Sequence, residues 1–146
     1  MKMQNDKAKF KKDFKERLYR FVLKLIEFLD GLPKDNVSRR LGDQLLRSGA
    51  IIPGNYIGGQ SGSSKKDFTN YLNTSLKSAN ESKLWLALLR DSKRAGAKEV
   101  DWFLKEQDEI SKIFATNILT LKGKRSFCIF ICHFAFRCLI FHFSLR

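Results

Sequence analysis

The sequence predicts an all-α protein, an antiparallel up-and-down four-helix bundle with a hydrophobic C-terminal tail. Apolar residues recur at spacings of three and four in four successive segments, which is the period of an amphipathic helix. The body of the chain has no segment with the alternating period of a strand, and stretches rich in Gly, Pro and Ser separate the helical segments. Four such helices joined by short connections bury their apolar faces most economically as a bundle. We place one bundle domain at residues 1–125 of the 146 and an extension at residues 126–146.

The first helix is expected over residues 6–30, where an apolar stripe begins at Phe10 and continues to Leu29. It should end at Gly31-Leu32-Pro33. Gly favours the end of a helix, and Pro disfavours helical geometry in the residue before it.

The second helix is expected to begin near Asn36 or Ser38. Its apolar stripe runs to Ile52, and Pro53 and Gly54 should bend or weaken its last turn, because Pro removes a backbone donor and Gly has low helix propensity.

A flexible connector is predicted at residues 58–64, Gly-Gly-Gln-Ser-Gly-Ser-Ser. Ser64, followed three residues later by Asp67, resembles a capping box and predicts the start of the third helix there. This helix should run to about Arg94, and Gly96 is its expected stop.

The fourth helix is expected from Lys98. Acidic residues crowd its start and the basic residues Lys122, Lys124 and Arg125 lie at its end, a distribution that complements the helix dipole.

The charge of the chain is strongly positive, with 28 Lys and Arg against 15 Asp and Glu. Residues 1–125 hold 26 of the basic and all 15 of the acidic side chains, a net charge of +11, whereas about 2 to 8 serves the solubility of a small domain. The excess predicts salt-sensitive, sequence-independent binding to the phosphate backbone of RNA or DNA. No helix-turn-helix, zinc-finger or aromatic RNA-binding pattern indicates sequence-specific recognition. The residues expected to form this basic surface are Lys11, Lys12, Lys15, Arg17, Arg20, Arg39, Arg40, Lys65, Lys66, Arg90, Lys93 and Arg94.

Catalytic residues, cofactors and metal sites are not expected in the body, which contains neither Cys nor His. The Gly/Ser connector lacks the Gly-Lys-Ser/Thr ending of a phosphate-binding loop, and no strand precedes it. The absence of Cys fits a reducing cytoplasm, and the polar N-terminus lacks the apolar stretch of a secretory signal. We therefore expect a cytoplasmic protein that is not an enzyme.

Three polar residues on or beside the apolar stripes, Arg47, Asn55 and Glu81, are predicted to form a structural polar cluster that fixes helix register. A ligand or partner site is the alternative. A general acid or base role for Glu81 would need a second titratable group nearby, and the body offers no His or Cys for it.

The tail is apolar at 14 of the 17 residues from 127 to 143. Arg137 near its middle would cost about 2.5 to 3.5 kcal/mol in a membrane, and the Phe, Ile and Leu residues of the tail, at about 0.3 to 0.6 kcal/mol each, would offset that cost, so insertion is expected to be marginal. The Cys and His spacing, Cys-x3-Cys-His-x4-Cys-x3-His, matches no known zinc module. The interpretations left open are translation beyond an ancestral stop, membrane or lipid contact, and an oligomer-packing element.

Three segments carry a family resemblance: Gln44 to Gly59, Ser64-Lys65-Lys66-Asp67-Phe68, and Glu81-Ser82-Lys83-Leu84-Trp85-Leu86. They resemble the four helix bundle protein family, also called the 23S rRNA intervening-sequence-encoded proteins, and the likeness covers about residues 10–123. The sequence departs from the family at Gly58 and Ser78, where an acid is common, and both departures remove negative charge.

The resemblance implies a small cytoplasmic bacterial bundle, often a homopentamer, without established enzymatic activity. The fold is also similar to the accessory variability determinant of diversity-generating retroelements, a basic pentameric ring that engages a reverse transcriptase and nucleic acid. The expected partners are therefore further copies of the chain in a homopentamer, the backbone of RNA or DNA, and a reverse transcriptase or another protein. The alternatives are a protein-interaction adaptor that does not bind nucleic acid and a bundle tethered to a membrane by the tail.

Overall fold

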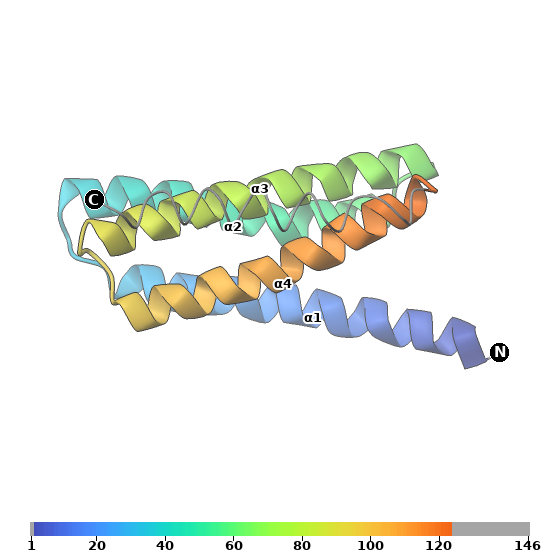
Figure 1. Cartoon of the computed structure of the whole chain (residues 1–146), viewed down its shortest axis with the longest axis horizontal. Coiled ribbons are helices and arrows are strands. Elements are labelled where there is room, and N and C mark those ends of the chain that lie inside the picture. The colour runs from blue at the N-terminus through green and yellow to red at the C-terminus, as the bar shows by residue number, and fades with distance from the viewer. Residues whose placement is uncertain (1, 124–146) are drawn as a thin grey trace.

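The computed structural model describes the backbone of residues 2–123 and the side chains of residues 8–123. Within this range the chain forms four helices and no strand: α1 (Lys2–Asp30), α2 (Asn36–Gly59), α3 (Lys65–Asp91) and α4 (Ala97–Leu121). Successive helices run in opposite directions (Figure 1). The predicted all-α bundle is confirmed. The expectations for the tail lie outside the described residues.

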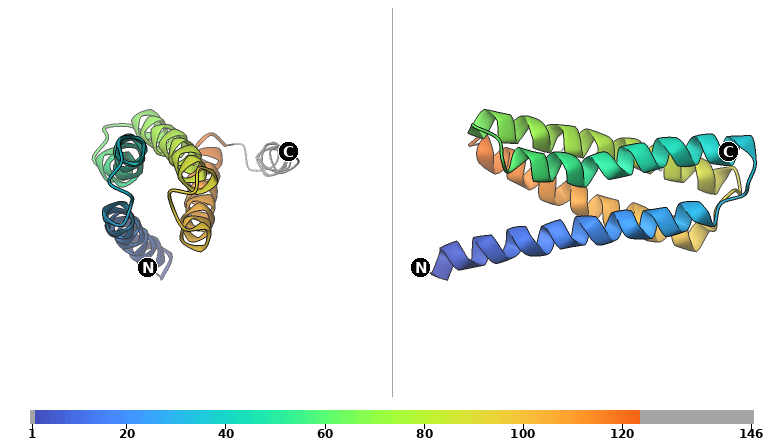
Figure 2. Two further views of the ribbon diagram at one scale, coloured as in Figure 1. Left: turned by 90° about the vertical axis from the view of Figure 1, so that its left-hand side faces the viewer. Right: turned by 180° about the vertical axis from the view of Figure 1, so that it is seen from behind.

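The four helices lie at the corners of a bundle when it is viewed end on (Figure 2). α2 packs on α1 and on α3, and α3 packs on α4. The remaining side of the bundle, between α1 and α4, is wider than the other three. In the described residues, no Cα atom of α1 comes within 8 Å of a Cα atom of α4. The N-terminal end of α1 also diverges from the other helices (Figures 1 and 2).

Aromatic side chains span this wide side between α1 and α4. Phe21 and Phe103 meet edge to face with ring centroids 5.9 Å apart, and Phe14 meets Phe114 at 5.6 Å in the same way. Large rings hold α1 and α4 together at a distance that smaller side chains could not bridge. Aliphatic side chains fill the rest of the interior; those with no exposed surface are Leu18, Leu25, Leu45, Ile52, Leu72, Ala79, Leu86, Leu89, Val100 and Ile110.

Small residues bring α2 close to both of its neighbours. A Cβ atom on Gly49 would lie 2.4 Å from Leu25 Cδ2 of α1, and one on Gly59 would lie 2.7 Å from Tyr71 Cβ of α3. Between α2 and α3, Ser82 Oγ donates to Ser48 Oγ at 2.8 Å. The close approach therefore requires residues without bulk at these positions.

Pro53 does not interrupt α2, which continues as a helix to Gly59. The expectation that a connector begins at residue 58 is wrong, and Pro53 and Gly54 do not end the helix. Ile52, Tyr56 and Gly59 are buried on the same face, so burial beyond Pro53 outweighs the cost of its missing donor.

The predicted helix start at Ser64 is confirmed. Ser64 Oγ accepts from the backbone N–H of Asp67 at 3.1 Å, and Asp67 Oδ2 accepts from the Ser64 hydroxyl at 2.8 Å rather than from its backbone N–H. This hydroxyl and that of Ser63 lower the pKa of Asp67.

The third helix ends at Asp91, three residues earlier than expected. Lys93, with φ of 58°, takes the left-handed conformation that usually falls to Gly after a helix, and the Arg94 N–H donates to the carbonyl of Leu89 at 2.9 Å. Gly96 instead lies at the N-cap of α4.

Candidate nucleic-acid interface

Basic side chains from different helices gather at the two ends of the bundle. α1 begins, α2 joins α3 and α4 finishes at one end, on the right of Figure 1. The residues that we name the basic end are Lys11, Lys12, Lys15, Lys65, Lys66 and Lys122. At the opposite end, Arg39 and Arg40 lie near the start of α2, and the α3–α4 connection carries Lys93.

Four of the twelve basic residues expected from the sequence are engaged by carboxylates. The strongest pairing is Arg17 with Glu106, in which Nε and Nη2 donate to Oε1 and Oε2 at 2.6 and 2.9 Å. This bond raises the pKa of Arg17 above its ordinary value. Arg20 pairs with Glu16, one turn away on the same helix.

Arg90 is held by two carboxylates at the end opposite the basic end. Its Nε lies 2.9 Å from Asp91 Oδ1 and its Nη1 lies 3.1 Å from Asp101 Oδ1. Phosphate would have to compete with two existing partners at this guanidinium, so Arg90 is a poor candidate for backbone contact.

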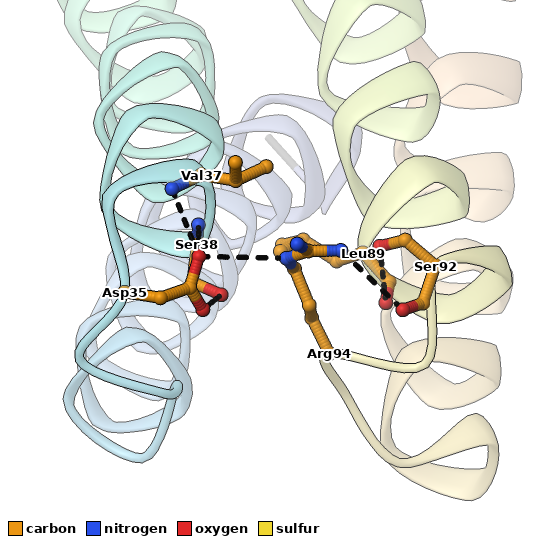
Figure 3. Close-up of polar contacts among 6 residues, drawn as sticks. All are labelled: Asp35, Val37, Ser38, Leu89, Ser92 and Arg94. Atoms are coloured by element: carbon orange, nitrogen blue, oxygen red, sulfur yellow. Dashed lines mark hydrogen bonds and ion pairs between the residues drawn. The ribbon is translucent and has the colours of Figure 1, made fainter.

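Arg94 links two connections of the bundle at this same end (Figure 3). Its Nε lies 3.7 Å from Asp35 Oδ1, and Nη1 donates to the carbonyl of Ser92 at 3.4 Å. Asp35 caps α2, and its carboxylate accepts from the hydroxyl of Ser38 at 2.6 Å and from the backbone N–H of the same residue at 3.0 Å. Bonding to Ser38, first by the hydroxyl and then by the backbone N–H, lowers the pKa of Asp35 to about 2.

The other eight predicted cations have no carboxylate within 4.0 Å among the described residues. They are Lys11, Lys12, Lys15, Arg39, Arg40, Lys65, Lys66 and Lys93, and all but the half-buried Lys15 are exposed. Five of them lie at the basic end, where Asp13, Glu16 and Asp67 are the nearest acids in sequence, and Glu16 is paired with Arg20. The geometry therefore concentrates uncompensated positive charge at the basic end.

The predicted polar cluster is only partly brought together. Arg47 Nη2 lies 3.5 Å from Glu81 Oε1, joining α2 to α3 on a surface where the Arg47 side chain is 65% exposed. Asn55 takes no part in that pair, because its Nδ2 donates to the carbonyl of Ile51, one turn back on its own helix, at 3.2 Å. Ser78 is buried, so an acid missing at this position changes the interior more than the surface charge.

The sequence places Ser75, Ser82 and Gln107 on the apolar stripes of their helices, and all three are buried, but it does not predict which polar groups they contact. Ser48 and Ser82 are hydrogen-bonded across α2 and α3, and Ser75 Oγ donates to the carbonyl of Ile52 at 3.1 Å. Gln107 is fully buried, and neither atom of its amide has a hydrogen-bond partner in the described part of the chain. The run of small residues on the inner face of α3 was the available signal for the serines.

No helix within residues 2–123 is long and apolar enough to cross a membrane. No group of three His, Cys, Asp or Glu side chains able to hold a metal ion occurs in that range either. The Cys and His residues considered for zinc lie outside it.

Comparison with known proteins identifies a family model. The model for the 23S rRNA-intervening sequence protein matches residues 11–116. A crystal structure of a protein of unknown function from the S23 ribosomal protein family of Bacteroides thetaiotaomicron VPI-5482 is similar in fold, with a TM-score of 0.69 and 27% sequence identity. That match covers 74% of this chain and 96% of the other. Among curated proteins, no match is found.

Proposed function

The chain belongs to the 23S rRNA-intervening sequence protein family, and we propose that it is a non-enzymatic cytoplasmic scaffold whose basic end binds the backbone of RNA or DNA. The observation that carries the proposal is the gathering of lysines from α1, α3 and α4 at one end without carboxylate partners. Contacts of lysine with phosphate displace condensed counterions, so this binding is independent of sequence and weakens with salt.

Self-association is the second part of the proposal, and an exposed apolar strip on the outside of the α1–α2 pair supports it. We define the strip as Tyr19, Leu23, Ile26, Leu46, Ala50 and Ile57. The close approach of Gly49 to Leu25 sets the register of the two antiparallel helices, and it places Ile26 level with Leu46 and Leu23 level with Ala50. Such a strip favours contact with another protein surface.

A second apolar patch lies on the outer face of α3, where Leu84 and Leu88 are exposed one turn apart. Two different patches on one molecule favour a head-to-tail contact, in which the strip of one copy packs on the α3 patch of the next. Contacts of this type close into a ring when the rotation between neighbouring copies divides a full turn, and otherwise they form an open filament. We propose a homopentamer, the assembly that the family resemblance implies.

Binding to nucleic acid is tested by fluorescence anisotropy of a labelled oligonucleotide over a series of salt concentrations. The double variant Lys65→Gln/Lys66→Gln removes two cations without partners, and Arg20→Gln/Lys112→Gln removes two cations that are already paired with carboxylates. We expect the first variant to flatten the dependence of log K on log salt by about 0.7 to 0.9 for each phosphate that a substituted lysine would otherwise neutralise. The second should change this slope much less.

Equal slopes for wild type and both variants would contradict the assignment of the basic end. A wild-type protein that binds no oligonucleotide even at low salt would contradict nucleic-acid binding altogether. That result would favour a protein-interaction adaptor. Its partner, a reverse transcriptase or another protein, would then bind without nucleic acid.

Self-association is tested on the full chain by size exclusion with light scattering. Leu23→Arg places a charge in the middle of the strip, and Val37→Arg places the same charge on an exposed apolar residue outside it. We expect a multimer for wild type and Val37→Arg, and a smaller species for Leu23→Arg. A wild-type monomer, or an unchanged mass for Leu23→Arg, would contradict the interface.

A further inference from the structure

A groove runs along the wide side of the bundle, between α1 and α4, on the outer surface. Its larger part has a volume of about 520 Å³ and its smaller part about 290 Å³, and Lys24 and Trp102 line both parts. The groove exists because α1 and α4 are held apart by the aromatic side chains beneath it, Phe21 and Phe103 among them. An open groove along two helices fits a chain segment better than an enclosed small molecule.

The charge of the groove is opposite to that of the protein. Carboxylates outnumber cations on its walls by five to three: Asp13, Glu16, Glu27, Glu99 and Glu106 against Arg17, Arg20 and Lys24. Two of these acids are already paired, Glu16 with Arg20 and Glu106 with Arg17. The other three have no ion-pair partner within the described residues.

Trp102 presents an aromatic surface in the middle of this acidic groove. Its side chain is 40% exposed, and Lys24 Nζ lies 4.1 Å from the centroid of its ring. A cation over the face of tryptophan is attracted by the ring quadrupole. Lys24 thus occupies a position in which a cation from outside would also be favoured.

We propose that this groove binds a lysine- or arginine-rich segment of a protein partner, with one cation of the segment on Trp102 and others beside Glu27, Glu99 and Asp13. The inference goes beyond the scaffold function and does not depend on it. A partner that itself binds nucleic acid carries positive charge and is repelled by most of this surface. The groove is where the sign of the surface charge is reversed, so a basic segment can approach there.

The experiment uses nuclease-treated full-length protein and a synthetic oligoarginine peptide, with an oligoglutamate peptide for comparison. Trp85→Phe leaves Trp102 as the sole tryptophan reporter, and the change is mild because Trp85 Nε1 makes no hydrogen bond in the described part of the chain. In this background, oligoarginine should change the fluorescence of Trp102 and oligoglutamate should not.

Two comparisons separate a specific site from a general electrostatic effect: Trp102→Ala, which leaves the charge of the protein unchanged, and two acid-to-amide double variants that remove the same charge inside and outside the groove. Lys24→Gln frees the ring and removes a repelling charge, so the peptide should bind more tightly. Trp102→Ala, followed by anisotropy of a labelled peptide, should weaken binding by about two- to fivefold. Glu27→Gln/Glu99→Gln should also weaken it, whereas Asp30→Asn/Asp43→Asn removes the same charge outside the groove and should weaken it less.

Three outcomes would overturn the proposal: no change in Trp102 fluorescence with oligoarginine, no gain for Lys24→Gln, or equal losses for the two acid-to-amide double variants. A fall in oligomer mass on Trp102→Ala would identify a second copy as the occupant and would also overturn it. None of these results depends on whether the basic end binds nucleic acid, so the two proposals fail separately.

Discussion

Replacing Gly49 by Ala tests how closely α1 and α2 pack. The new Cβ atom would lie 2.4 Å from Leu25 Cδ2, and Leu25 has no exposed surface into which its side chain can move. Overpacking of this kind costs about 1 to 3 kcal/mol. Alanine is favoured over glycine within a helix by about 1 kcal/mol, so the net change should be a loss of about 0 to 2 kcal/mol.

Gly54→Ala is the matched control, because Gly54 lies in the same helix and a Cβ atom there would meet no other atom within 4 Å. It gains the helix propensity without the clash and should stabilise by up to about 1 kcal/mol. The propensity cancels in the comparison of the two variants. The difference in their free energies of unfolding should therefore be the packing cost, about 1 to 3 kcal/mol.

Urea denaturation followed by circular dichroism at one fixed protein concentration measures this difference, with the slope against denaturant checked for constancy. Shortening the opposing side chain by Leu25→Val should reduce the cost of Gly49→Ala, since the two residues are in contact. If Gly49→Ala were as stable as Gly54→Ala, the close approach of α1 and α2 at Gly49 would be wrong.

Three further predictions concern the helix ends and the α2–α3 interface. Ser82→Ala removes the hydrogen bond to Ser48, and the Ser48 hydroxyl still donates to the carbonyl of Gln44 at 2.9 Å, so no donor is left without a partner. We expect the free energy of unfolding to fall by about 0.5 to 1.5 kcal/mol in urea denaturation, and no change would contradict the buried bond. Lys93→Gly relieves the left-handed backbone at φ of 58° and should stabilise by up to about 1 kcal/mol, and a lower melting temperature would argue against that conformation. The pKa of Asp35 is lowered from 3.8 to about 2, so its contribution to stability is present above pH 3.8 and is lost as the pH falls through 2. Asp35→Asn should therefore destabilise the protein at neutral pH and match wild type near pH 2, and parallel stability curves over that range would contradict the contribution of the Asp35 charge.

The sequence predicts the helices well because burial of one face imposes a spacing of three and four, and that spacing survives local exceptions. Pro53 is such an exception, and it does not end α2. Its missing N–H indicates a helix end, yet the face that continues through Ile52 and Tyr56 is buried, and burial decides the outcome. At Lys93 the local rule fails in the other direction, since no glycine marks the left-handed residue.

The candidate sites were less predictable, because a charge in the sequence does not reveal its partners. Arg17 and Lys65 are equivalent cations in a composition, whereas the structure pairs Arg17 with Glu106, which lies far away in the sequence, and leaves Lys65 exposed. The acidic groove depends on how far apart α1 and α4 are held, a distance that no pattern within one helix encodes. The structure therefore adds the ion pairs between helices and the distances between them, which the sequence does not reveal.

The two parts of the proposed function are linked by symmetry. In a cyclic ring every copy of a residue lies at the same height along the rotation axis, so head-to-tail contacts would place all the basic ends at one level. Their fields would then add along a single rim, and one nucleic acid could contact several copies at once. Leu23→Arg separates this effect from charge alone, because it adds a positive charge to each copy. If that variant dissociates the ring and also weakens binding to nucleic acid, assembly rather than net charge sets the affinity.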